Sequence, residues 1–163
     1  MSTYNTVSAW SHAGSSDEAA SQGALSRAIV LFGRFLFVAI FLMSGPFHFS
    51  QAEIAAGAIA GVRWPGLLVP LSGVIAFLGA LSILVGYHAK IGAWLLVLFL
   101  VPVTLTMHNF WSANNAVTVQ MHLTAQIQMV NFMKNASMIG CALLISQLGA
   151  GPASLDARRS ASR

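Results

Sequence analysis

Four long apolar stretches constrain what this chain can fold into more than any other feature of its sequence. They cover about residues 29–47, 67–85, 91–107 and a fourth stretch that starts between 123 and 130 and ends near 148. A helix rises about 1.5 Å per residue, so about 20 apolar residues cross the hydrocarbon core of a bilayer. Only 7% of the chain is charged, against about 25% in soluble domains. We therefore predict an all-α membrane protein, a bundle of four transmembrane helices.

The distribution of Lys and Arg predicts how this bundle lies in the membrane. Four spans place both termini on one side, together with the turn at 86–90. That side would carry Arg27, Lys90, Arg158, Arg159 and Arg163. The opposite side would carry Arg63 in its first loop. Because loops rich in Lys and Arg stay in the cytoplasm, we expect both termini to be cytoplasmic.

The two ends of the chain differ in composition from the apolar middle. Residues 1–24 are rich in Ser, Ala and Asn and lack the basic start and short apolar core of a cleaved signal peptide. We predict a disordered tail over 1–24, a membrane domain over 25–148 and a basic tail over 149–163. The net charge is +4, but the basic residues form no run, so we do not expect a nucleic-acid partner. The single cysteine, Cys141, excludes an intrachain disulfide.

Polar residues in and beside the spans are the best guide to function. A cation in hydrocarbon costs a few kcal/mol or more, so such residues usually face a bundle interior or a wet cavity. In a four-helix bundle, most of them would gather at the face opposite the termini. These residues are His48, His108, Asn109, Trp111, Lys134 and Asn135. Arg34 lies toward the other face, where its side chain could reach back to the surface.

Each polar motif has two interpretations. The run TMHNFW at 106–111 suits a polar headgroup such as a quinone ring, but Trp111 could equally anchor the helix end while His108 caps it. In the run NFMKN at 131–135, Lys134 needs a partner, which only Glu53 could provide, a wet cavity, or a route to the nearby surface. A haem between His48 and His108 is not favoured, because both lie at helix ends.

The sequence offers no self-contained enzyme signature. No HExxH or HxxxH pattern, phosphate loop or nucleophile triad is present, so we predict no metal site. Only four acidic residues occur in the whole chain, which argues against catalysis by paired carboxylates. Whether the chain is an enzyme, or part of one, stays open at this point.

The order of these motifs resembles the DoxX family of small four-helix bacterial membrane proteins. The resemblance covers about residues 27–148. It rests on Arg34 before Ser44-Gly45, on Gly73, Gly79 and Gly86 followed by Lys90, on His108 to Trp111, and on the NFxKN run that leads to Gly140. Two positions depart from the family pattern: Ala76 stands where a Glu is common, and His48 stands where many members have a Lys.

The resemblance implies a multi-pass protein of a bacterial inner membrane and a membrane subunit of a quinone-linked oxidoreductase. The lipid bilayer and redox subunits would be its partners, quinone its cofactor, and a homo-oligomer stays open. The candidate cofactor-binding residues are His108, Asn109, Trp111, Lys134, Asn135, His48 and Arg34. Two alternatives stay open: a non-catalytic accessory or assembly protein that docks a larger complex, and a conductor of small solutes or protons.

Overall fold

The computed structural model describes the backbone of residues 4–113 and 119–162, and the side chains of residues 21–111 and 124–162. All regular elements in these ranges are helices. They are α1 (Tyr4–Ser44), the 3-10 helix η1 (Gly45–Phe49), α2 (Gln51–Ile59), α3 (Pro65–Val85), α4 (Ala89–Met107), the 3-10 helix η2 (Phe110–Ala113), α5 (Val119–Leu148) and α6 (Leu155–Ala161). The prediction of an all-α protein is confirmed.

Four of these helical segments are long and apolar enough to cross a membrane. Within the described residues they are Ser21–Phe49, Pro65–Val85, Ala89–Met107 and Thr124–Leu148. Large apolar side chains point outward along them, and each of the following is more than half exposed: Phe32, Leu36, Leu98, Leu105 and Leu144. Such a surface is stable only against lipid, so the chain is a multi-pass membrane protein, as the four apolar stretches predicted.

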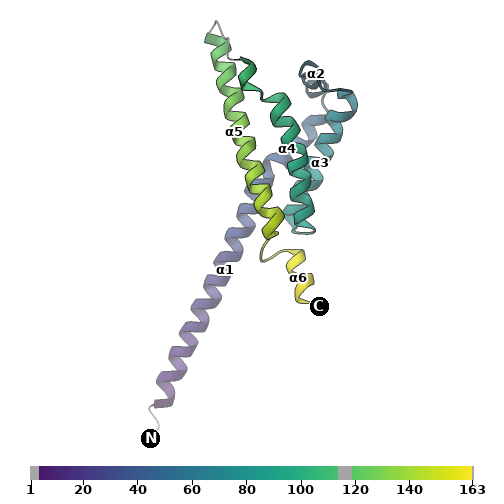
Figure 1. The fold of residues 1–163 in the computed structure, drawn as a ribbon. Helices are drawn as coiled ribbons and strands as arrows, with labels where there is room; N and C mark the ends of the chain where they lie inside the picture. Colours follow the sequence, from purple (N-terminus) through teal and green to yellow (C-terminus); the bar gives the residue numbers. More distant parts are fainter. Residues whose placement is uncertain (1–3, 114–118, 163) are drawn as a thin grey trace.

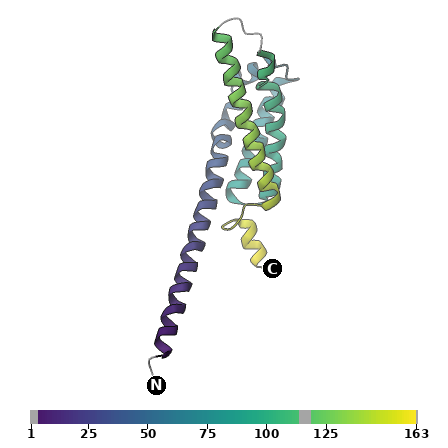
Figure 2. The same ribbon diagram turned by 60° about the vertical axis from the view of Figure 1, so that its left-hand side comes forward.

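The helices form an open bundle in which α3 and α4 are central. α1 packs on α3, and α5 packs on α4 (Figures 1 and 2). Both termini and the α3–α4 turn lie at one end, which we call the terminal end. We call the opposite end, with η1, α2 and η2, the distal end. Both termini therefore share one side of the bundle as expected, while their cytoplasmic location stays a prediction.

Small residues let the central helices approach closely. A Cβ added at Gly79 of α3 would lie 2.8 Å from the carbonyl oxygen of Gly92 on α4. Ala76, Ala80 and Ala93 beside this contact are fully buried. Helices in lipid associate through such close van der Waals packing, because no hydrophobic effect drives them together there. The glycines and alanines therefore fix the α3–α4 pair around which the other helices pack.

The backbone is helical over much of the two predicted tails, while the division into tails and membrane domain stays a prediction. α1 begins at Tyr4, so the backbone of residues 4–24 is helical and continuous with the first span, whereas residues 1–3 and 163 lie outside the described part. This segment contains no proline and is rich in alanine, which favours a helix. Within the predicted basic tail, residues 155–161 form α6, whose start is capped by the Ser154 hydroxyl at 3.0 Å from the N–H of Ala157.

Candidate functional site

The two polar motifs of the sequence meet at the distal end of the bundle. α4 ends at Met107, and the side chain of the next residue, His108, turns toward α5. Its Nδ1 atom lies 2.7 Å from Oε1 of Gln128. An amide oxygen only accepts hydrogen bonds, so in this arrangement Nδ1 of His108 carries the proton. This bond joins the end of α4 to α5 across the bundle.

An aromatic cluster lies beside this hydrogen bond. The ring of Phe132 on α5 packs edge-on against Phe110 and Trp111 of η2, with centroid distances of 5.4 and 5.8 Å. Edge-to-face pairs at such distances add about 0.5–1.5 kcal/mol beyond the area that they bury. Trp111 is still 47% exposed, so its indole presents a free surface at the membrane boundary.

Lys134 reaches toward this end from deeper in the membrane. Six residues separate it from Gln128 on α5, which corresponds to about 9 Å along a helix axis. Its ammonium donates a 3.1 Å hydrogen bond to Oδ1 of Asn131, one turn nearer the distal end. Among the described side chains no ion pair joins Lys134 to Glu53, the partner that the sequence offers. The lysine instead extends along its own helix toward the boundary.

We define the distal mouth as His108, Phe110, Trp111, Gln128, Asn131, Phe132 and Lys134. Two other candidates lie close to it in the sequence: Asn109 is exposed beside His108, and Asn135 is buried one position after Lys134. Sequence reasoning did not select Gln128 or Phe132. The polarity of Gln128 within an apolar helix was the available signal, and Phe132 offered none.

His48 takes a packing role, in contrast to the prediction that it closes the polar site. Its Nδ1 lies 3.1 Å from the carbonyl oxygen of Ser44, one turn earlier. Its ring packs edge-on against Phe99 of α4, with a centroid distance of 5.5 Å. A Cβ added at Gly73 of α3 would lie 2.5 Å from the Cβ of His48. The histidine therefore fills the space where η1, α3 and α4 meet.

Arg34 is buried at the terminal end and does not reach the surface. It is 5% exposed, and its NH2 group donates a 3.0 Å hydrogen bond to the carbonyl oxygen of Ala153. Its Nε and NH1 atoms are buried without a hydrogen-bond partner in the described part of the chain. Arg34 therefore ties α1 to the segment before α6, far from the other candidate residues.

Asp156 of α6 binds the start of α4. Its carboxylate accepts hydrogen bonds from the backbone N–H groups of His88 and Ala89, at 3.0 and 3.1 Å. Partial burial acts to raise the pKa of this carboxyl. The two backbone hydrogen bonds and the nearby charges of His88 and Arg159 outweigh it and hold the pKa below its usual range. Hydrogen bonds from the start of α4 to α6 thus stabilise the terminal end, and no local sequence pattern predicts them.

The family of the chain follows from comparison with known proteins. The model of the SURF4 family matches residues 66–161, which is more than half of the chain and covers helices α3 to α6. The chain belongs to the SURF4 family. The resemblance to the DoxX family is therefore wrong as an identification, and with it the predicted role as a subunit of a quinone-linked oxidoreductase. The predicted bacterial origin conflicts with the same match.

A yeast protein is similar to this SURF4-family chain. The two are 29% identical over 86 residues, and the relative is the ER-derived vesicles protein ERV29 of Saccharomyces cerevisiae. The matched part is 53% of this chain and 26% of the yeast protein, so the chain spans about a quarter of the length of this relative. No solved structure matches the chain. Quinone as a ligand of the distal mouth stays an untested prediction.

Proposed function

We propose that this chain is a receptor in the membrane of transport vesicles, where its distal mouth binds soluble proteins that the vesicles carry. The observation that carries the proposal is the match of helices α3 to α6 to the SURF4 family. The similarity to a yeast protein of ER-derived vesicles supports a location in the vesicle membrane. The same similarity favours a secretory membrane of the endoplasmic-reticulum type, rather than a bacterial inner membrane, as the location.

The chemistry of the distal mouth suits the binding of a peptide segment. Trp111 offers an exposed ring, and Lys134 offers an exposed ammonium group. The His108–Gln128 bond and the Phe132 cluster fix η2 with Trp111 against α5, and Lys134 extends toward this end from the middle of α5. Exposed aromatic rings held on a rigid frame are among the groups that dominate binding at protein interfaces, and a nearby cation adds electrostatic complementarity. The mouth therefore provides both apolar contact and charge for an extended peptide.

The predicted orientation agrees with this role. The terminal end carries most of the Lys and Arg residues, so the positive-inside rule predicts that it faces the cytoplasm. The distal mouth would then face the lumen, where soluble secretory proteins are found. A receptor in this orientation could hold such proteins while its terminal end faces the cytoplasmic side of a forming vesicle.

A budding reaction tests the proposal. Membranes of the endoplasmic reticulum that carry the tagged chain are allowed to form vesicles, and the soluble proteins in the vesicles are quantified by mass spectrometry. The double variant His108→Ala with Lys134→Gln is compared with Arg158→Gln, which removes an exposed cation from the terminal end. Loss of a charge-assisted hydrogen bond costs about 1.5–3 kcal/mol, or roughly tenfold or more in affinity.

The expected result is that the chain enters vesicles in every case. A defined set of soluble proteins should fall about tenfold with the double variant and stay unchanged with Arg158→Gln. Exclusion of the wild-type chain from vesicles would contradict the vesicle assignment. An identical set of soluble proteins with and without the two distal substitutions would contradict the receptor role.

A further inference from the structure

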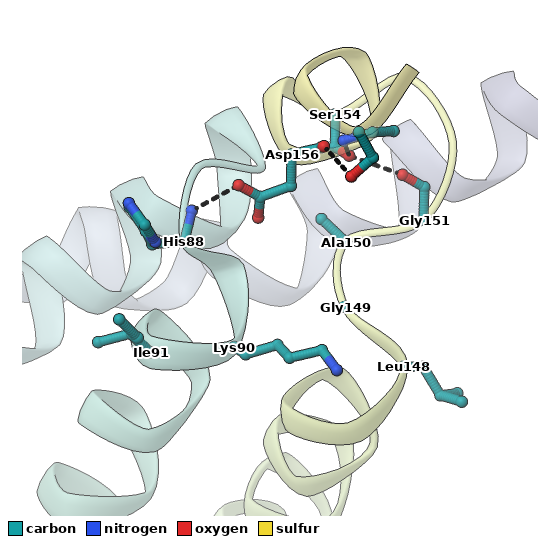
Figure 3. Close-up of a pocket in the computed structure, with 11 residues that line it drawn as sticks. His88, Lys90, Ile91, Leu148, Gly149, Ala150, Gly151, Ser154 and Asp156 are labelled. Atoms are coloured by element: carbon teal, nitrogen blue, oxygen red, sulfur yellow. Dashed lines mark hydrogen bonds between the residues drawn. The ribbon is translucent and has the colours of Figure 1, made fainter. Parts of the chain in front are cut away.

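A groove opens at the terminal end, at the opposite side of the bundle from the distal mouth. It has a volume of about 490 Å³ and lies between the start of α4, the end of α5 and α6 (Figure 3). The residues that matter here are His88, Lys90, Ile91, Leu148, Ser154 and Asp156. Because α4 and α5 are membrane spans that begin or end at this groove, it lies at the boundary between hydrocarbon and water.

The groove combines an apolar wall with one cation. Ile91 and Leu148 line the groove and are 59% and 79% exposed, and because both lie at the ends of membrane spans we expect them to face lipid acyl chains. Lys90 is exposed, and Figure 3 shows its side chain extending from α4 across the groove toward the end of α5. Its Cε atom lies 3.7 Å from the place of a Cβ added at Gly149. The aliphatic stem therefore rests on the loop after α5, and the ammonium is held over the groove.

Lys90 presents its ammonium to the groove. Within the described residues no hydrogen bond or ion pair binds this ammonium. Among the described residues that line the groove, the one carboxylate is that of Asp156. It keeps its negative charge, but its two oxygens accept hydrogen bonds from the N–H groups of His88 and Ala89 and form no ion pair with Lys90. Arg34 adds a buried positive charge behind Ser154, since both side chains contact the position of Gly86. The positive charges of Lys90 and Arg34 therefore outnumber the negative charge of Asp156, and the field in the groove favours an anion.

We propose that this groove binds an anionic phospholipid. The phosphate of the headgroup would pair with the Lys90 ammonium, and the first part of an acyl chain would lie along Ile91 and Leu148. Basic pockets between spans bind lipid headgroups on the side of the membrane that carries anionic lipids, which is the side predicted for the terminal end. This site shares no residue with the distal mouth, so failure of either proposal would not contradict the other.

Native mass spectrometry of the full chain in mild detergent tests this site. The probes are dioleoyl phosphatidylglycerol, dioleoyl phosphatidylcholine and inorganic phosphate in large excess as a competitor. Lys90→Gln removes the cation of the groove, and Lys90→Arg keeps it. Arg158→Gln is the matched control, because Arg158 is an exposed cation of the same end that does not line the groove. Since Lys90 is exposed, these variants are expected to fold, which their thermal midpoints check.

The expected result is that the wild-type chain, Lys90→Arg and Arg158→Gln retain phosphatidylglycerol to the same extent. Lys90→Gln should retain it about fivefold less, the effect of one basic residue near an anionic surface. Equal retention by Lys90→Gln would overturn the proposal, as would an equal loss in Arg158→Gln. Retention of phosphatidylcholine at the same level would also overturn it. Displacement of the lipid by inorganic phosphate would show a site for free phosphate instead.

Discussion

The side chains of His108 and Gln128 lie 2.7 Å apart, although 20 residues separate them in the sequence. This contact fixes the end of α4 against α5 at the level where the bundle meets water. The Phe132 ring packs against η2 just beside it and closes the same joint with apolar contacts. The shape of the distal mouth therefore depends on a side-chain hydrogen bond as well as on helix packing.

A double-mutant cycle measures the strength of this bond. We expect His108→Ala and Gln128→Ala to be non-additive, with a coupling free energy of about 0.5–1.5 kcal/mol, typical of hydrogen bonds in membrane proteins. Thermal unfolding in detergent of the two single variants and the double variant gives this value. Additive effects on the free energy of unfolding would show that the two side chains do not interact.

Gly73 and Gly140 provide a matched pair of helical glycines. A methyl group at Gly73 would clash with His48, whereas one at Gly140 would meet nothing within 4 Å. Gly73→Ala should lower the free energy of unfolding by about 1–3 kcal/mol, the usual cost of overpacking. Gly140→Ala should leave it unchanged or raise it by up to about 1 kcal/mol, because alanine favours a helix. Equal effects of the two substitutions would contradict the packing of His48 against α3.

The carboxylate of Asp156 makes the terminal end sensitive to acid. The pKa of this group is lowered in the folded chain, so its hydrogen bonds to α4 contribute fully above the unfolded pKa of about 3.9. They are lost as the pH falls through the lower folded pKa. The amide NMR signal of Ala89, which donates to Asp156, should therefore show an acid transition below about pH 4. In Asp156→Asn this acid transition should be absent, and its persistence would exclude Asp156 as its cause.

The substitution Arg34→Met should affect the stability of the bundle and the docking of α6 in different ways. A buried cation without a paired anion costs free energy, so replacing Arg34 by an apolar side chain of similar length should not lower the stability of the bundle. The same change removes the donor to Ala153, so the segment before α6 should loosen. We expect an unchanged or higher thermal midpoint together with faster tryptic cleavage at Arg158 and Arg159. Arg27→Met, two turns earlier on the same helix, should change neither. A much lower midpoint with α6 still protected would contradict this reading of Arg34.

Most of the membrane fold could be predicted, because an apolar stretch of about 20 residues usually forms a membrane-spanning helix. The spans expected at 67–85 and 91–107 agree closely with Pro65–Val85 and Ala89–Met107. The end segments were harder to predict. Residues 4–24 form a helix, but their alanine content is also compatible with disorder. α6 docks through Asp156, whose hydrogen-bond partners lie 67 and 68 residues away in the sequence.

The candidate site could be predicted only in part. Motif position placed His108 and Lys134 near one end, but the partners Gln128 and Phe132 depend on how α5 is aligned against α4, which periodicity does not reveal. Short polar runs also proved insufficient to identify the family. Part of the resemblance to DoxX rested on Arg34 and Ser44-Gly45, which lie outside the region that matches SURF4.

The most direct test of the receptor role places a photocrosslinking amino acid at position 111 or position 94. Trp111 and Trp94 are 47% and 52% exposed, but Trp111 lies in the distal mouth and Trp94 lies on the lipid-facing side of α4. On irradiation of sealed vesicles, position 111 should capture the same soluble proteins whose loading falls in the variant with His108→Ala and Lys134→Gln. Position 94 should capture lipid. Lipid adducts alone at both positions would contradict the proposal that the distal mouth binds transported proteins.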